Sequence, residues 1–210
     1  DLILLCLGKN SKIISVFLGK RIIEQNINVI FSGGALYNKI QNYNRKNIRN
    51  YFEIFIAPGN HDVGISKDNA KRDIFRLSPF YLNDFPYVIY RDNIKLVIED
   101  STISNWRISE KTLDLLKNKD EKLIILFRHN MPIKELLPLS NSLNYSNDLH
   151  RANTLSKKIP NEFTIISGDT GAYGHTPGFK CNKFKNINFL TNGIGDRTRD
   201  QIIIISKEKI

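Results

Sequence analysis

The order of apolar and helix-like segments in the first quarter of the chain constrains the fold most strongly. Residues 2–7, 28–32 and 51–57 predict buried strands, because each is a short apolar run that ends at a glycine or proline turn signal. Between them, residues 11–25 carry an apolar stripe at helical spacing, and residues 38–50 are polar and helix-like. This strand–helix–strand–helix–strand order predicts a parallel sheet with helices on its faces.

The rest of the chain adds antiparallel and further buried strands. Residues 87–90 and 95–99 predict a hairpin, and residues 109–118 predict a helix with Ser109 as its N-cap. Further strands are expected at residues 123–127, 163–167, 188–191 and 201–206. Residues 132–160 are polar and are predicted to be a mostly irregular, loop-rich insertion. We interpret residues 1–210 as a single α/β domain with two sheets.

The charge balance indicates the class of partner. The chain of 210 residues has a net charge of +10, which favours a phosphorylated or otherwise anionic small molecule or glycan. Nucleic acid is a less favoured partner, because basic and aromatic residues are not interleaved. The two cysteines predict reduced thiols. Neither a signal peptide nor an apolar run of membrane-spanning length is visible, which favours the cytoplasm.

Chemically capable residues follow several of the predicted strands. Ligands of open α/β sheets bind beyond the carboxyl ends of the strands, so these positions are the first candidates for a site. Asn, His and Asp are metal-ligand or acid–base types, and they recur there. The positions are Lys9, residues 59–62, Asp100, His129, Asn130 and Asp169.

Three of these segments resemble one family. Residues 57–63 (APGNHDV) look like the G-N-H-D/E block of the calcineurin-like metallophosphoesterases. Residues 98–102 (IEDST) resemble the family's strand that ends in Asp-Ser/Thr, and residues 126–132 (LFRHNMP) resemble the strand that carries a lone His ligand before a proline. The resemblance spans nearly the whole chain. It implies a four-layer αββα sandwich of two mixed sheets.

The resemblance also implies roles for individual residues. Asn60, His129 and Asp169 would be metal ligands. His61 would be the general acid or would stabilise the transition state, and Asp62 would orient it. The expected substrate-binding residues are Lys9, Arg128, Asn130 and His175.

The chain departs from the family's pattern at the other blocks. The family normally holds two metal ions, but here Gly34 occupies the position of the bridging Asp, and the strand before Gly8 ends without Asp or His. In the last block Asp169 stands at the first His position, although residues 174–177 (GHTP) offer a rival register. Alternatively, residues 1–8 precede the second block with Lys9 at the Asp position. The domain would then be truncated at its N-terminus, with the D-x-H block upstream.

These departures would reduce the metal site that the resemblance implies. Two dications about 3.5–4 Å apart repel each other and need anionic ligands between them. The remaining Asn, His and Asp set suits one divalent ion, such as Mn²⁺, Fe²⁺, Zn²⁺ or Mg²⁺, or none. Lys9 is a candidate to place its ammonium group where the lost cation would be. Two functions remain open: hydrolysis of a phosphate mono- or diester at a reduced site, and a catalytically impaired phosphoesterase that binds an anionic ligand or a partner protein.

Overall fold

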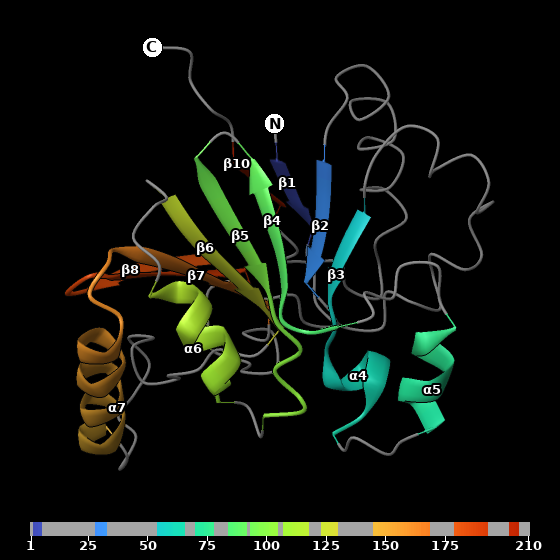
Figure 1. Cartoon of the computed structure of the whole chain (residues 1–210), viewed down its shortest axis with the longest axis horizontal. Coiled ribbons are helices and arrows are strands. Elements are labelled where there is room, and N and C mark those ends of the chain that lie inside the picture. Colours follow the sequence, from blue (N-terminus) through green and yellow to red (C-terminus); the bar gives the residue numbers. More distant parts are fainter. Residues whose placement is uncertain are drawn as a thin grey trace.

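The described strands form two mixed sheets. The structure, a computed structural model, describes residues 2–5, 28–32, 54–65, 70–77, 84–91, 93–104, 107–117, 123–129, 145–168, 179–192 and 202–205. The first sheet has the order β10-β1-β2-β3 (Figure 1). Its strands are β1 (Leu2–Leu5), β2 (Asn28–Ser32), β3 (Ile54–Ala57) and β10 (Ile202–Ile205). The pairs β1–β2 and β2–β3 are parallel, as the segment order predicts, and β10 is antiparallel to β1.

The second sheet has six strands in the order β4-β5-β6-β7-β9-β8. Its central strands β5, β6, β7 and β9 are parallel, and the edge strands β4 and β8 are antiparallel to their neighbours. The predicted hairpin is confirmed as the β4–β5 pair. The strands are β4 (Tyr87–Arg91), β5 (Ile94–Ile98), β6 (Leu123–Arg128), β7 (Phe163–Ser167), β8 (Phe179–Phe184) and β9 (Ile187–Asn192).

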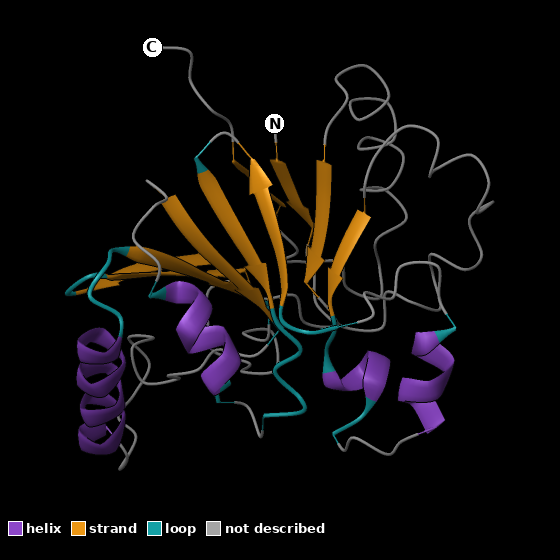
Figure 2. Ribbon diagram, viewed as in Figure 1, coloured by secondary structure: helices purple, strands orange, loops and turns teal. Residues whose placement is uncertain are grey.

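The described helices lie toward one end of the strands (Figure 2). They are α4 (Asn60–Val63), α5 (Ala70–Arg76), α6 (Glu110–Leu116) and α7 (Tyr145–Lys158). The predicted N-cap of α6 is confirmed, because the Ser109 hydroxyl accepts a hydrogen bond from the Thr112 amide at 3.1 Å. The helices expected at residues 11–25 and 38–50 lie outside the described residues.

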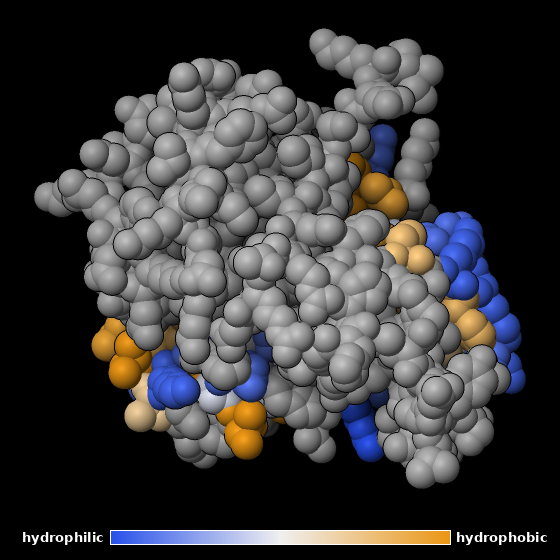
Figure 3. Space-filling view, turned by 180° about the vertical axis from the view of Figure 1, so that it is seen from behind, coloured by the Kyte–Doolittle hydropathy of each residue, from blue (hydrophilic) through white to orange (hydrophobic). Residues whose placement is uncertain are grey.

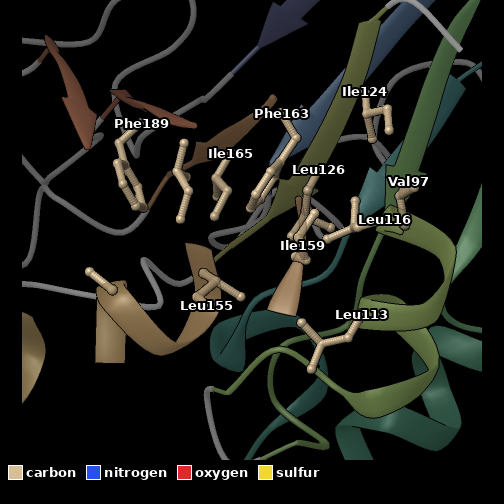
Figure 4. Close-up of a cluster of buried hydrophobic side chains, with 12 residues drawn as sticks. Val97, Leu113, Leu116, Ile124, Leu126, Leu155, Ile159, Phe163, Ile165 and Phe189 are labelled. Atoms are coloured by element: carbon tan, nitrogen blue, oxygen red, sulfur yellow. The ribbon is translucent and has the colours of Figure 1, made fainter. Parts of the chain in front are cut away.

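The six-stranded sheet is apolar on both faces. Period-two alternation sends Leu126 of β6 toward the helices and its neighbour Phe127 toward the other sheet. On the helix side, residues of α6 and α7 complete a core with the strands (Figure 4). On the opposite side, Ala57 and Phe55 of β3 pack against residues of β4, β5, β6 and β7, so this second core joins the two sheets. A central position between two apolar layers explains the nearly continuous apolar runs of β6 and β7.

The prediction of a mostly irregular segment at residues 132–160 is wrong for its second half, which forms α7. This helix is largely polar, but its residues Ala152 and Leu155, and Ile159 directly after it, are buried against the sheet at helical spacing. Strand β8 was also missed, because its lysines break the apolar pattern. Lys183 of β8 and Lys185 in the turn after it are exposed, and charged side chains at an edge strand discourage pairing with another chain. Seen from behind, hydrophilic residues gather on the side of the molecule where α7 and one end of β8 lie in Figure 1 (Figure 3).

Candidate functional site

Several strands of the two sheets end close together and present polar residues there. Helix α4 begins after the two residues that follow β3, and Asp100 is the second residue after the end of β5. His129 directly follows β6, and Gly168 directly follows β7. Because β5, β6 and β7 are parallel neighbours, their carboxyl ends lie along one edge, with α4 and α5 beneath β3 at the same end of the molecule (Figure 1). This edge matches the position where the sequence predicted a site.

The GNHD segment forms a single helical turn. The amides of Asp62 and Val63 donate to the Gly59 carbonyl at 2.9 and 3.0 Å, and the Gly59 amide donates back to Asp62 Oδ2 at 3.0 Å. Gly64 ends the turn with φ of 73° and ψ of −173°, a conformation that favours glycine. Asp62 therefore holds the backbone of the turn that carries His61. The side chain of His61 is outside the described residues.

Gly59 is required by its contact with His129. A Cβ atom placed on Gly59 would lie 2.8–2.9 Å from three ring carbons of His129. No side chain fits at that distance, so the ring of His129 packs directly on the glycine backbone. The glycine of the GNHD block thus has a physical explanation in this chain: it admits the imidazole from the neighbouring sheet.

Asn60 and His129 meet at this contact. The Nε2 atom of His129 lies 3.1 Å from Oδ1 of Asn60, although the two residues are 69 positions apart. An amide oxygen only accepts hydrogen bonds, so His129 donates to Asn60 here in the tautomer that carries its proton on Nε2. His129 is buried and Asn60 is half-buried. The carbonyl of His129 accepts a hydrogen bond from the Gly168 amide at 2.9 Å, which ties the end of β6 to the end of β7.

A buried ion pair lies on the α5 side of this edge. Asp100 Oδ2 is paired with the guanidinium of Arg72, and both side chains are buried. The other carboxylate oxygen of Asp100 accepts hydrogen bonds from the Thr102 amide at 2.9 Å and the Thr102 hydroxyl at 2.6 Å. Arg72 also donates to the Thr102 hydroxyl at 2.6 Å. This triad fastens α5 to the end of β5.

Arg128, predicted as a substrate contact, lies in the interior. Its side chain is 0% exposed and forms an ion pair with Glu99 at 3.0 Å between Nη1 and Oε2. The two charged groups are in close contact, but Nη1 and Oε2 are not aligned as in a hydrogen bond. Burial lowers the pKa of Arg128, and the carboxylate of Glu99 opposes this shift. The alternation along β6 explains the position, because consecutive residues 128 and 129 point to opposite faces of the sheet.

Glu99 is the hub of this interior cluster. Its Oε1 atom accepts hydrogen bonds from the Ser109 amide at 2.8 Å and the Thr112 hydroxyl at 2.9 Å, both at the start of α6. Glu99 and Arg72 were not predicted from the sequence as residues that support the site. The available signal was an acidic pair at the end of an apolar strand, which required buried cations elsewhere in the chain.

The structure leaves four of the predicted positions untested. Lys9, Asn130, Asp169 and His175 lie outside the described residues. Asp169 comes directly after Gly168, whose amide is bound to His129. Among the described residues, no group of three His, Cys, Asp or Glu side chains is arranged to hold a metal ion. None of the described helices has the length and apolarity needed to cross a membrane.

The chain was compared with known proteins in three ways. Scans against protein families, curated proteins and solved structures each return no match. Its function must therefore be inferred from the residues and geometry described above.

Proposed function

We propose that this chain is a calcineurin-like phosphoesterase domain with a reduced metal site, built as a four-layer αββα sandwich. Two mixed sheets joined by an apolar core, with α6 and α7 on the outer face of one, support three of the four layers. The sequence order of the strand ends also supports it: GNHD after β3, Asp100 after β5 and His129 after β6.

The observation that carries the proposal is the contact between Asn60 and His129. Two ligand atoms at right angles, each about 2.1 Å from a cation, are about 3.0 Å apart. The 3.1 Å between Oδ1 and Nε2 fits this spacing. Asn60 and His129 would hold one divalent ion, with Asp169 as a third ligand next to Gly168. Binding would replace the proton on Nε2, since a metal-bound imidazole is neutral.

The proposed reaction is hydrolysis of a phosphate ester. The bound ion would supply Lewis acidity and would lower the pKa of water. Water would attack phosphorus and release a proton to solvent, and the bond from phosphorus to the ester oxygen would break. His61 would donate a proton to the leaving oxygen and regain one from solvent. Asp62 acts through its hydrogen bond to Gly59, which fixes the turn that carries His61. The net charge of +10 favours anionic substrates.

One observation favours the second candidate, a catalytically impaired domain that binds an anion or a partner protein. Three carboxylates at this edge are committed to protein donors: Asp62 to Gly59, Asp100 to Arg72, and Glu99 to Arg128. A ligand set that relies on Asn60 and His129 carries no negative charge of its own, which weakens its hold on a dication.

The two candidates differ in metal binding and turnover. We expect the purified protein to bind one Mn²⁺ per chain by calorimetry and to hydrolyse p-nitrophenyl phosphate with Mn²⁺ present. His129→Ala and Asn60→Ala should abolish both properties. His150→Ala is the matched control, because residue 150 lies on α7 in the helix layer.

Each result has a distinct meaning. Metal binding with no turnover on aryl mono- and diesters would contradict hydrolysis and favour the binding domain. Failure to bind Mn²⁺, Fe²⁺, Zn²⁺ or Mg²⁺ would overturn the metal site itself. Turnover that survives His129→Ala would show that a different site carries the activity.

A further inference from the structure

Glu99 and Asp100 are consecutive residues that face opposite sides of the six-stranded sheet. Glu99 contacts Arg128 and the start of α6 on the helix side. Asp100 contacts Arg72 and Thr102 on the side of α5. Both carboxylates are buried, with 2% and 1% of their residue surface exposed. One short stretch of backbone at the end of β5 therefore anchors two separate parts of the molecule.

Each anchored part carries one of the two groups that meet in the site. Arg128, held by Glu99, directly precedes His129 on β6. Arg72, held by Asp100, belongs to α5, which packs against α4 and thus against the turn that carries Asn60. Both Asn60 and His129 are thus connected, through these ion pairs, to the two residues that follow β5.

We infer that Glu99 and Asp100 are positioning residues that together set the separation of Asn60 Oδ1 and His129 Nε2. This inference rests on the proposed function where it concerns metal binding. A buried ion pair is often no more stabilising than an apolar pair of similar volume, so stability alone gives little reason for two of them here. The ion pair of Glu99 with Arg128 and its hydrogen bonds from Ser109 and Thr112, together with the bonded Asp100–Arg72 pair on the other side, restrict how far β6 and α5 can shift relative to the end of β5.

The test replaces each pair without leaving a buried charge. Glu99→Gln with Arg128→Met keeps an acceptor for Ser109 and Thr112, and Asp100→Asn with Arg72→Met keeps an acceptor for Thr102. The exposed pair Lys183–Glu162 provides the control, as Glu162→Gln with Lys183→Gln. Thermal unfolding first establishes that each variant folds.

Two readouts then separate positioning from mere stability. The first is the imidazole ¹⁵N signal of His129 in the metal-free protein at one fixed pH, assigned by its loss in His129→Ala. The second is Mn²⁺ affinity by calorimetry. We expect both pair variants to shift the His129 signal and to weaken Mn²⁺ binding by about 10–100-fold, the usual effect of losing outer supporting contacts, while the control changes neither.

An unchanged His129 signal with unchanged Mn²⁺ affinity in folded pair variants would overturn the inference. If the unaltered protein binds no Mn²⁺, the proposed function fails separately, and the His129 signal alone decides the positioning role. If a pair variant does not fold, Arg128→Lys and Arg72→Lys keep each charge but change its reach. A His129 signal that stays fixed in both would equally overturn the inference.

Discussion

The two faces of the six-stranded sheet use polar residues in different ways at the same strand ends. On the helix face, Glu99 and Arg128 form a sealed ion pair beneath α6. On the face toward the other sheet, Asn60 meets His129, and Arg72 pairs with Asp100. Adjacent residues such as Arg128 and His129 thus lie in different environments, because a strand alternates its side chains between the two faces of the sheet.

Neighbouring residues of one sequence motif can therefore have different roles in the structure. Arg128 and His129 stand side by side in the segment that resembles the family's lone-His strand, yet only His129 reaches the site edge. Arg128 forms a buried ion pair in the core, whereas the imidazole of His129 contacts Asn60 at the candidate site. Truncation of the buried pair on the helix face should therefore cost the most stability, and substitutions at the Asn60–His129 contact should affect ligand binding most directly.

The largest effect on stability is expected from Arg128→Ala. It leaves the Glu99 carboxylate buried without its cation, which costs about 3–5 kcal/mol in the free energy of unfolding. Urea denaturation followed by circular dichroism measures this cost. The double variant Glu99→Gln with Arg128→Met removes both charges and should recover most of it. A loss below about 1 kcal/mol in Arg128→Ala, the level typical of exposed pairs, would contradict a sealed pair.

On the opposite face, Gly59→Ala should disturb the site directly. The added Cβ meets the His129 ring at 2.8–2.9 Å, and we expect a cost of about 1–3 kcal/mol from overpacking, together with weaker Mn²⁺ binding. A double-mutant cycle with His129→Ala measures the coupling, because removing the ring removes the clash. An equal cost in both backgrounds would show that the ring contact is not the reason for the glycine.

Local patterns predicted much of this architecture. The bounds of β2 and β7 are as expected, and the N-cap Ser109 is confirmed. These features depend on short apolar runs and on a side chain that bonds to a backbone group three residues away, so neighbouring residues contain the required information. The convergence of Asn60 and His129 was also foreseeable, but through the family resemblance and the rule for strand ends.

The remaining features depend on contacts between distant residues. Arg72 lies 28 positions from Asp100, and nothing in its own helix distinguishes it from Lys71. The side of the sheet that Arg128 faces follows from alternation only once His129 is assigned to the site. Helix α7 was not predicted because only a narrow stripe of its surface is apolar. Burial of this stripe against the sheet depends on residues far away in the sequence.

A smaller effect is expected at the start of α6. Ser109→Ala removes the hydroxyl that accepts from the Thr112 amide but keeps the backbone amide that Glu99 binds, so the cost should be about 1 kcal/mol. Urea denaturation provides the measurement, and Ser109→Thr, which retains a hydroxyl, serves as the control. A loss as large as that of Arg128→Ala would mean that the cap, rather than the ion pair, holds the helix face together.

The smallest effect should come from the exposed pair at the β8 edge, which contrasts with the buried pairs. A hydrogen bond from Asn188 and then the contact with Lys183 lower the pKa of Glu162 from its ordinary 4.5. A carboxylate with a lowered pKa in the folded state stabilises the protein above its unfolded pKa, and this contribution is lost as the pH falls through the folded value. Glu162→Gln should therefore melt slightly below the unaltered protein at about pH 7, and the difference should disappear once the pH falls below the folded-state pKa of Glu162 and should shrink in high salt. A difference that persists at the acidic end would mean that Glu162 acts through packing and not through its charge.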